Sequence, residues 1–381
     1  MGAPVRVLHV LSSTMRAGVE MMVLNLFREM DRERVLFDFV AHDLGEDDLG
    51  DEIRRLGGRV FYVPLLSGVG IRKFVRIIRG VIEENGPYAA VHTHTDYQGG
   101  FSALAAKKAG VARRICHAHL DTRKMRSPVF LAKKLLGRAF IRNNATQLCA
   151  CSRYAGIALF GRRAANRGLV KVVNNGIDLT GYAERDPQAR ERLVLSCNGG
   201  DNTRLIGNVA RLSPVKNHAF ILDMAAEAKA AGLDYRFVIV GSGDLYGELL
   251  EKRRRMGVAD TVFFLGTRED VPQLMQCFDA FVLPSHAEGL PLTVVEAQAA
   301  GTPVIAATCV PKEADMGLGL LATTPVDDGA RAWLERVGRV TERARRPDAA
   351  SRLEAVRRRG FDAKSNVRTV AALYGLDDEP A

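Results

Sequence analysis

Two carboxylates, Glu288 and Glu296, stand eight positions apart in the stretch Pro284–Gly301. A carboxylate in a loop can accept hydrogen bonds from hydroxyl groups, and a second carboxylate a helical turn further on can hold another pair of hydroxyls. Backbone amides at the start of a helix suit anionic groups such as phosphate. The stretch therefore predicts a site that grips one hydroxyl-rich ligand at two points.

Two short strands and one helix have to position these carboxylates. Asp279–Leu283 and Thr302–Ala306 are apolar runs of strand character, and the segment between them contains helix formers. Pro291 near the first turn and Gly301 at the end mark the limits of that helix. Glu288 then lies in the loop at the carboxyl end of a strand, and Glu296 lies about one turn into the helix. In open parallel sheets ligands bind at this edge.

Two cations are expected at the same edge. Arg211 follows the predicted strand Leu205–Ala210, and Lys216 precedes the predicted helix Ala219–Ala231. A guanidinium and an ammonium together suit a diphosphate, the first as a planar fork and the second as a point charge. The alternative is a pair of solvated surface charges.

Two glycine turns follow predicted strands. Gly18 opens a helix after the strand Val5–Leu11, and Gly241 with Gly243 follows the strand Arg236–Val240. Glycines at these places let backbone amides approach a phosphate, or simply form a tight turn. No complete GxGxxG follows a strand, and neither GxSxG nor GxxxxGK[ST] occurs, which argues against nicotinamide, hydrolase and P-loop sites.

Three histidines, His94, His117 and His119, fall near predicted strand carboxyl ends in the first half of the chain. Each could be a packing residue, a turn ligand or a catalytic group. They do not form the helical HExxH pattern, and no Cys/His set has structural-zinc spacing. We expect neither a bound metal nor another cofactor.

The composition is that of a globular protein of 381 residues, long enough for two domains. There is no apolar run of about 18 residues that could cross a membrane, and no signal peptide is expected before the strand Val5–Leu11. The six cysteines show no CxxC spacing, and we expect reduced thiols in a cytoplasmic protein.

The charge is placed unevenly along the chain. Residues 1–180 carry 28 Lys and Arg against 16 Asp and Glu, and the remainder carries 26 against 28. The excess is concentrated in Ala105–Lys171, where Asp121 is the single acid. Within it, Ser127–Arg142 is predicted as a basic amphipathic helix with the cations Lys133, Lys134, Arg138 and Arg142. Such a patch attracts an anionic membrane, an acidic substrate or nucleic acid, or serves solubility alone.

Strands and helices alternate in two series, one before and one after Asn174–Asp178, which predicts an α/β protein with two doubly wound halves. Taken together, the motifs resemble those of the retaining glycosyltransferases of family 4. The motifs that carry the resemblance are Gly18-Val-Glu20, Ser152-Arg-Tyr154, Asn175-Gly-Ile-Asp178, Arg211 with Lys216, Gly241-Ser-Gly243, Leu265-Gly-Thr-Arg268 and the spacing Glu288-x7-Glu296.

The resemblance implies the GT-B fold, with two facing Rossmann-like domains. The first domain, residues 1–177, would face the acceptor, and the second, 178–360, would bind the nucleotide sugar. A C-terminal helix in 361–381 would cross back to the first domain. The resemblance also implies a sugar transfer that retains the anomeric configuration and needs no metal. The donor would be a UDP-sugar, and the group transferred would be a hexose or N-acetylhexosamine.

Residue roles follow from the resemblance position by position. Arg211 and Lys216 would bind the diphosphate and stabilise it as it leaves, and Glu296 would hold the ribose. The transferred sugar would lie against Glu288, the amides of Gly289 and Leu290, and His119, with His117 as the alternative histidine that spacing leaves open. Arg268 would flank the base, and Gly241 and Gly18 would contact the donor, Gly18 through its amide, although Ala17 replaces the first glycine of the family's usual pair.

The expected acceptor is a sugar or a lipid-linked sugar in exopolysaccharide or capsule synthesis, reached from the inner face of the cell membrane, with the basic helix holding the protein to anionic lipid. A GT-B epimerase or phosphorylase is the enzymatic alternative. A nucleic-acid-binding protein is the alternative outside enzymes, and the lack of aromatic residues interleaved in the basic patch argues against it.

Overall fold

The computed structural model describes residues 3–16, 18–42, 49–120, 122, 125, 127–343 and 346–376, with residue 343 in its backbone alone. Ala17 and Asp121 lie outside the described residues, as does the end of the predicted segment 361–381. The chain divides into two compact units, Met1–Ile177 with Gly360–Ala381, and Asp178–Arg359. Gly360 thus belongs with the first unit, whereas the sequence placed it in the second.

The first unit is built on one parallel sheet. Over the described residues its order is β3-β2-β1-β4-β5-β6-β7. The strands are β1 (Val5–Val10), β2 (Val35–His42), β3 (Val60–Val63), β4 (Tyr88–Thr93), β5 (Arg113–Ala118), β6 (Gln147–Ala150) and β7 (Val170–Val172). The helices are α1 (Gly18–Glu29), α2 (Gly50–Arg55), α3 (Leu66–Asn85), α4 (Gly99–Lys108), α5 (Pro128–Asn144), α6 (Arg153–Phe160), α7 (Arg162–Asn166) and α16 (Ala363–Tyr374).

Two apolar layers cover this sheet, because successive side chains of a strand point to opposite faces. On one face Val7, Phe37 and Ile115 pack with α1 and α16. On the other face Leu8 and Val91 pack with α3 and α4. Strands buried on both faces read as continuous apolar runs, which is why the sequence revealed them.

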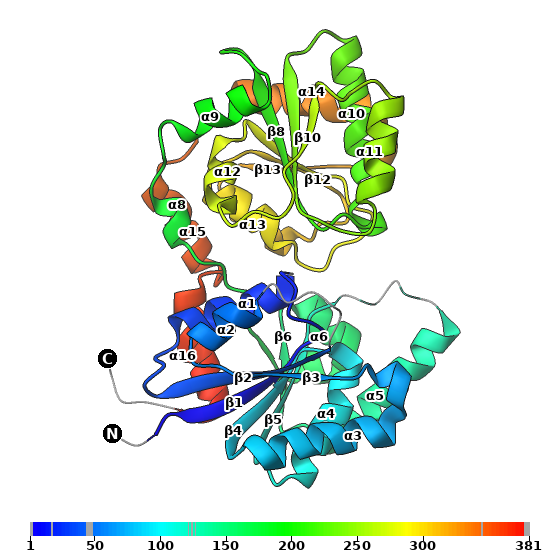
Figure 1. Ribbon diagram of the computed structural model, residues 1–381, viewed down its shortest axis with the longest axis vertical. Coiled ribbons are helices and arrows are strands. Elements are labelled where there is room, and N and C mark those ends of the chain that lie inside the picture. Colours follow the sequence, from blue (N-terminus) through cyan, green and yellow to red (C-terminus); the bar gives the residue numbers. More distant parts are fainter. Residues whose placement is uncertain are drawn as a thin grey trace. The chain divides into compact units, whose positions relative to one another are not determined.

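The second unit repeats this design with the sheet order β10-β9-β8-β11-β12-β13. Its strands are β8 (Arg204–Val209), β9 (Tyr235–Val240), β10 (Val262–Phe264), β11 (Ala280–Leu283), β12 (Val304–Ala307) and β13 (Leu321–Thr324). Its helices are α8 (Thr180–Ala183), α9 (Ala189–Ser196), α10 (His218–Ala230), α11 (Tyr246–Arg255), α12 (Val271–Cys277), α13 (Leu292–Ala299), α14 (Gly329–Arg343) and α15 (Ala349–Arg358). Helix α10 packs with α11 and α14, and α13 packs with α12 and α15 (Figure 1).

Each sheet has a point where the strand order reverses. In the first unit it lies between β1 and β4, and in the second between β8 and β11. Because the connections leave these neighbouring strands toward opposite faces, the loops at their carboxyl ends form a crevice in which such folds bind ligands. The two reversal points therefore select the places where a site is expected.

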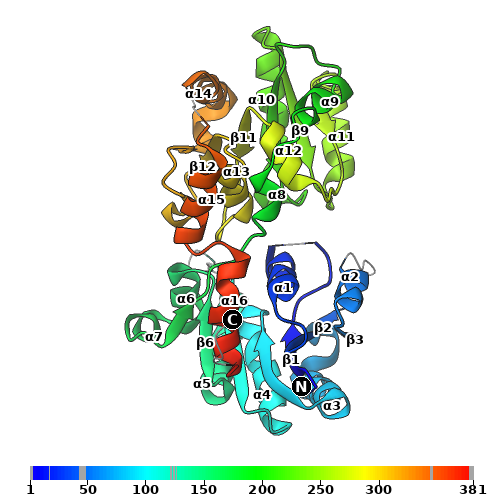
Figure 2. The same cartoon turned by 90° about the vertical axis from the view of Figure 1, so that its left-hand side faces the viewer.

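The last helix, α16, belongs to the first unit, as the sequence resemblance implied. It packs against α1 (Figure 2), and Asn366 donates from Nδ2 to the carbonyl oxygen of Asn174 at 2.9 Å. Asp362 caps its first turn by accepting from the amide of Ser365, which explains why the helix begins at Ala363. The sequence does not predict the strand β13, because Leu321 is its only large apolar residue.

Candidate functional site

An ion pair joins the two loops at the reversal point of the second sheet. Lys216, in the loop after β8, donates from Nζ to both carboxylate oxygens of Glu288, in the loop after β11, at 2.7 and 2.9 Å. The Glu288 side chain is only 6% exposed and that of Lys216 is 23% exposed. The structure thus brings together one predicted cation and one predicted carboxylate, 72 positions apart in the chain.

Backbone contacts hold these two loops in register. The amide of His286 donates to the carbonyl oxygen of Val215 at 2.8 Å, and Asn217 donates from Nδ2 to the carbonyl oxygen of Pro284 at 3.1 Å. Asn217 has a left-handed backbone, with φ of 54°, a conformation that Asn tolerates better than most residues. Hydrogen bonds therefore fix the two loops that carry Lys216 and Glu288 relative to each other.

The glycines after β9 are required by close packing of a third loop. A Cβ on Gly241 would lie 2.1 Å from the carbonyl oxygen of Ala210, and one on Gly243 would lie 2.5 Å from that of Leu212. Both glycines have positive φ, 133° and 155°. Because neither glycine has a side chain, the amide of Leu212 can donate to the backbone carbonyl oxygen of Ser242 at 2.8 Å. This bond holds the glycine loop against the loop that carries Arg211.

Arg211 and Arg268 lie on the exposed rim of these loops. Arg211 contacts Asp244 at 3.3 Å, and both side chains are largely exposed. Arg268 forms a two-point contact with Asp270, at 2.8 and 2.7 Å. The loop of Arg268 joins the glycine loop, because the amide of Gly241 donates to the carbonyl oxygen of Gly266 at 2.8 Å. Each arginine is held by an exposed acid, a contact of small energy that a ligand anion can replace.

Glu296 lies one turn into α13, at the position that the sequence predicted. Among the described residues no group donates a hydrogen bond to its carboxylate, and burial raises its pKa to about 7. Gly289 and Leu290 directly precede Pro291, the residue at the N-cap of this helix. A carboxyl group held without a partner beside a helix start can accept hydrogen bonds from the hydroxyls of a ligand.

Gly18 begins α1 in the first unit, at the carboxyl end of β1. It is exposed, and apart from its neighbours in the chain and the backbone of α1, no atom of the described residues lies within 4 Å of the place where a Cβ would stand. Two residues on, Glu20 is buried, and burial raises its pKa to about 7. The open surroundings leave the first amides of α1 accessible to an anion.

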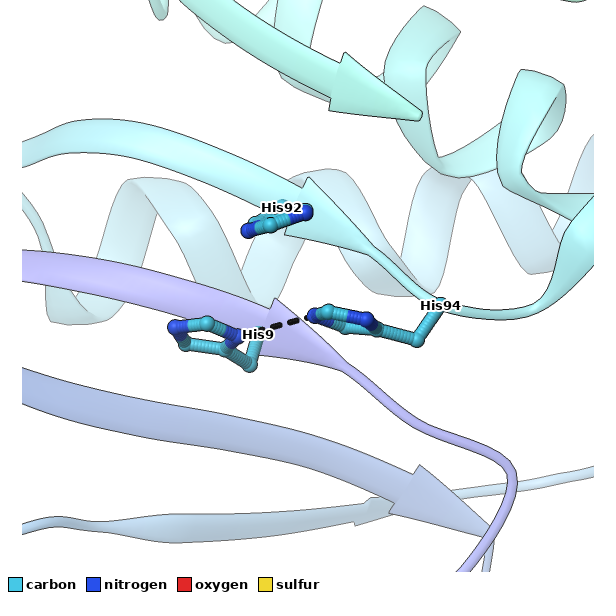
Figure 3. Close-up of side chains that lie close together, drawn as sticks. All are labelled: His9, His92 and His94. Carbon is cyan, nitrogen blue, oxygen red and sulfur yellow. Dashed lines mark hydrogen bonds between the residues drawn. The ribbon is translucent and has the colours of Figure 1, made fainter. Parts of the chain in front are cut away.

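Five histidines of the first unit are buried side by side. One comes from β1, two from the end of β4 and two from the end of β5. They are His9, His92, His94, His117 and His119, of which His94 and His119 directly follow their strands. Figure 3 shows His9 on β1 beside His92 and His94, with a hydrogen bond between His9 and His94. Period-two alternation places both His-x-His pairs on the face covered by α1 and α16. His117 and His119 are therefore both buried, and burial lowers the pKa of each ring.

Two overlapping trios of these rings, His9 with His92 and His94, and His94 with His117 and His119, offer nitrogens within 4.8 Å of one another. That spacing is compatible in size with a metal site, although the sequence showed no metal-binding pattern. The signal that could have indicated the cluster is the pair of His-x-His segments on adjacent parallel strands.

The helix α5 differs from its predicted form in one respect. Lys134 is buried and donates from Nζ to Oγ1 of Thr122 at 2.8 Å. The prediction that Lys134 is one of the exposed cations of this helix is therefore wrong. The reason is the close packing of α5 against the 3-10 turn Asp96–Gln98 that precedes α4. A Cβ on Gly137 would lie 2.2 Å from the carbonyl oxygen of Tyr97 in that turn, and Lys134 lies on the same helix face as Gly137. The outward face instead exposes Val129, Leu131, Leu135 and Leu136 next to Lys133.

Two protein-family models match the chain. The first, described as Glycosyltransferase Family 4, covers residues 16–180, and the second, described as Glycosyl transferases group 1, covers residues 203–343. Together they span the loops of both units described above. No helix among the described residues has the length and apolarity needed to cross a bilayer.

Relatives match along the chain. It is 42% identical over 375 residues to "Putative glycosyltransferase EpsF" of Bacillus subtilis (strain 168), covering 98% of this chain and 97% of that protein. It is 26% identical over 330 residues to the UDP-Gal:alpha-D-GlcNAc-diphosphoundecaprenol alpha-1,3-galactosyltransferase of Escherichia coli, with 79% of each chain covered.

Solved structures with the same fold include HepE from Anabaena in complex with UDP-glucose, with a TM-score of 0.75 at 22% identity, covering 98% of this chain and 100% of that one. WaaG, a glycosyltransferase involved in lipopolysaccharide biosynthesis, matches with a TM-score of 0.70 at 15% identity over 97% of this chain and 99% of its own. These likenesses confirm the predicted GT-B fold, an α/β architecture of two Rossmann-like domains.

Proposed function

This chain belongs to the family 4 glycosyltransferases, and on that premise we propose that it moves a hexose or an N-acetylhexosamine from a UDP-sugar to a sugar or lipid-linked sugar acceptor, with retention and without a metal. The product is an intermediate of a cell-surface polysaccharide such as an exopolysaccharide or capsule. The protein works in the cytoplasm, at the inner face of the membrane.

The observation that carries this proposal is the Lys216–Glu288 ion pair at the reversal point of the second sheet. A diphosphate bound beside Lys216 would present the sugar to Glu288, which can accept hydrogen bonds from its hydroxyls. Glu296, without a donor among the described residues, would accept from the ribose. One donor molecule would thus be held at its sugar, its diphosphate and its ribose.

In this reaction the protein mainly has to position the two substrates and stabilise the charge of the leaving diphosphate. The bond between the anomeric carbon and the diphosphate oxygen breaks, and a bond to the acceptor oxygen forms on the same face of the sugar, so the anomeric configuration is retained. The acceptor proton passes to the departing diphosphate. Arg211 and Lys216 would stabilise the negative charge that grows there, while the loops orient the two substrates.

Names of the related proteins favour the choice of donor and acceptor. The HepE structure contains UDP-glucose, and the Escherichia coli relative uses UDP-galactose and a diphosphoundecaprenol-linked sugar. A uridine nucleotide and a lipid-linked acceptor are therefore the substrates that we assign to this chain.

Thermal unfolding in the presence of nucleotide sugars tests the donor assignment. A ligand present at 100 times its dissociation constant stabilises a protein by about 2.7 kcal/mol, so UDP-sugars are expected to raise the midpoint of unfolding, while the matching GDP- and ADP-sugars leave it unchanged. A shift with GDP- or ADP-sugars alone would refute the uridine assignment. The anomeric configuration of the isolated product, read by NMR coupling constants, tests retention separately.

For the acceptor side we propose that α5 holds the protein to an anionic membrane. Val129 and Leu135 are each 64% exposed on its outward face, and Lys133 and Arg142 are exposed beside them. Exposed apolar groups next to cations are typical of helices that lie in the membrane interface. A lipid-linked acceptor would meet the enzyme at this surface.

Substituting Val129 and Leu135 together by serine is expected to weaken binding to vesicles that contain anionic lipid by about tenfold or more, since each buried CH₂ contributes about 0.8 kcal/mol. Changing Lys133, Arg138 and Arg142 to glutamine is expected to lower binding by about a hundredfold, because each of these three cations near the surface contributes about 1 kcal/mol. Vesicle sedimentation measures both effects. The control is Leu169→Ser with Leu195→Ser, at side chains 60% and 63% exposed elsewhere, and equal losses in the control would disprove the role of α5.

A further inference from the structure

The five buried histidines and Tyr374 form one unbroken chain of hydrogen bonds. Its links, in order, are His119 Nε2 to His94 Nδ1 at 3.0 Å, His94 Nε2 to His9 Nδ1 at 3.0 Å, His9 Nε2 to the Tyr374 hydroxyl at 3.3 Å, the same hydroxyl to His92 Nδ1 at 2.9 Å, and His92 Nε2 to His117 Nδ1 at 3.2 Å. The two ends, His119 Nδ1 and His117 Nε2, are buried and have no partner among the described residues.

At pH 7 every ring in this chain is expected to be neutral. Burial lowers the pKa of all five histidines well below the ordinary value, to about 3 for His9 and for His119. A neutral imidazole carries one N–H and one bare nitrogen, so each ring donates at one nitrogen and accepts at the other. Tyr374 likewise donates once and can accept once.

The links run head to tail, and this constrains the positions of the protons. Each link between two histidines joins the Nε2 of one ring to the Nδ1 of the next, and the Tyr374 hydroxyl joins His9 Nε2 to His92 Nδ1 in the same sense. If His119 carries its proton on Nε2, every other ring must do so too; if it carries the proton on Nδ1, every other ring follows. Only these two arrangements satisfy all five links.

We propose that the five histidines share a single tautomer, transmitted through Tyr374, and that this shared tautomer decides whether His119 Nδ1 accepts a hydrogen bond from a substrate hydroxyl or donates one to it. The functional part rests on the proposed function and on the place beside the transferred sugar that the sequence resemblance implies for His119. His9, His92, His94, His117 and Tyr374 are then positioning residues that act through His119.

Tyr374 is the central link of the chain. It lies on α16, is fully buried, and its hydroxyl is the only atom among the described residues that joins His9 to His92 in this series of bonds. Removing the hydroxyl leaves two separate segments, one of three rings ending in His119 and one of two rings ending in His117. Their tautomers then become independent.

The geometry favours this arrangement over a metal ion. In a linear hydrogen bond of 3.0 Å the lone pair of one nitrogen points at the N–H of the other. A metal ion between the two nitrogens on that line would lie about 1.5 Å from each of them. Zinc–nitrogen bonds are longer, at about 2.0–2.1 Å. The rings would have to turn away from each other to converge on a metal. A structural metal is nevertheless a distinct outcome of the test.

Nitrogen NMR of the full-length protein with ¹⁵N-labelled histidine decides the proposal, because protonated and bare ring nitrogens differ in chemical shift. All five rings are expected to show the same tautomer at pH 7 in the free protein. A mixture of tautomers, a charged imidazolium among the five, or a stoichiometric metal in the purified protein would overturn it. This readout does not depend on whether a nucleotide sugar binds.

The variant Tyr374→Phe tests the transmission. If a UDP-sugar shifts the ring nitrogens of His119 in the natural protein, it is expected to shift those of His92 and His117 as well; in Tyr374→Phe the shifts stop at His9. Tyr88→Phe is the matched control, because it removes a hydroxyl that donates to Asp38 at 3.0 Å within the same unit and leaves the chain intact. Shifts confined to His119 in the natural protein would overturn the proposal.

Kinetics connect the chain to catalysis. Tyr374→Phe is expected to lower kcat about tenfold while the KM for the UDP-sugar stays within about twofold, because a wrongly protonated His119 binds substrate and fails in the transition state. Tyr88→Phe is expected to keep kcat. Unchanged kcat with an unchanged common tautomer in Tyr374→Phe would refute the role of Tyr374.

Discussion

Lys216→Met is expected to lower kcat by about a hundred- to a thousandfold, the loss found when one preorganised group that stabilises developing charge is removed. The ammonium would face the diphosphate oxygen as the bond to the sugar breaks. Its removal would also leave Glu288, which is 6% exposed, without its cation. Both effects weaken the transition state more than the bound donor, so kcat should fall far more than the KM for the UDP-sugar rises.

Lys252→Met is the matched control for this measurement. Lys252 also lies in the second unit, is 27% exposed, and pairs with Asp223 at 2.7 Å. It differs from Lys216 in lying on α11, in the body of that helix. Rates of UDP release with a saturating acceptor should be normal in the control. A Lys216→Met protein that keeps more than about a tenth of the normal kcat would contradict the assignment of Lys216 to the diphosphate.

The sequence predicted which residues stand in the loops after β8 and β11 because the signals for these loops are local. Parallel strands buried on both faces appear as apolar runs, and the loops that follow them fall at one edge of the sheet. Once the strands before Arg211 and Glu288 were located, the loops that carry these residues had to lie at that edge. The reversal point between β8 and β11 then explains why Lys216 reaches Glu288 across 72 positions.

The histidine chain was beyond sequence reasoning for a physical reason. Its links depend on the register of β1, β4 and β5 and on the packing of α16, which brings Tyr374 to within 3.3 Å of His9 across 365 positions. The orientation of α5 was hidden in the same way: the contact of Gly137 with Tyr97 turns Lys134 inward, and a pattern of charges along one helix carries no information about its neighbours.

Exchanging each carboxylate for its amide is expected to separate the two proposed contacts to the donor. Glu296→Gln should weaken the binding of UDP by about tenfold, because an amide accepts hydrogen bonds from the ribose hydroxyls less strongly than a carboxylate. Glu288→Gln should leave the affinity for UDP within about twofold and lower kcat by about a hundredfold, because its contact is with the transferred sugar. Calorimetric titration with UDP and steady-state rates measure the two effects, and equal losses of UDP affinity would contradict the division of roles.

The pH dependence of donor binding gives Glu296 a signature of its own. Its pKa in the free protein is raised to about 7 by burial, and ribose hydroxyls that donate to the carboxylate bind the ionised form. Affinity for a UDP-sugar, which itself has no group titrating in this range, should therefore fall about tenfold as the pH drops from 8 to 6, in proportion to the ionised fraction. In Glu296→Gln this dependence should vanish.

Glu20→Gln provides the control, because Glu20 is a second glutamate whose pKa is raised to about 7 by burial, and it lies in the first unit. For both residues the folded protein holds the carboxyl proton more tightly than the unfolded chain does. The protonated carboxyl therefore adds to the free energy of unfolding. This contribution is complete below about pH 4.5 and is lost as the pH rises through 7. Both glutamine variants should therefore reduce the loss of stability between pH 5 and 8. Only Glu296→Gln should also flatten the pH dependence of donor affinity, and a flattened profile in Glu20→Gln instead would place the titrating group in the first unit.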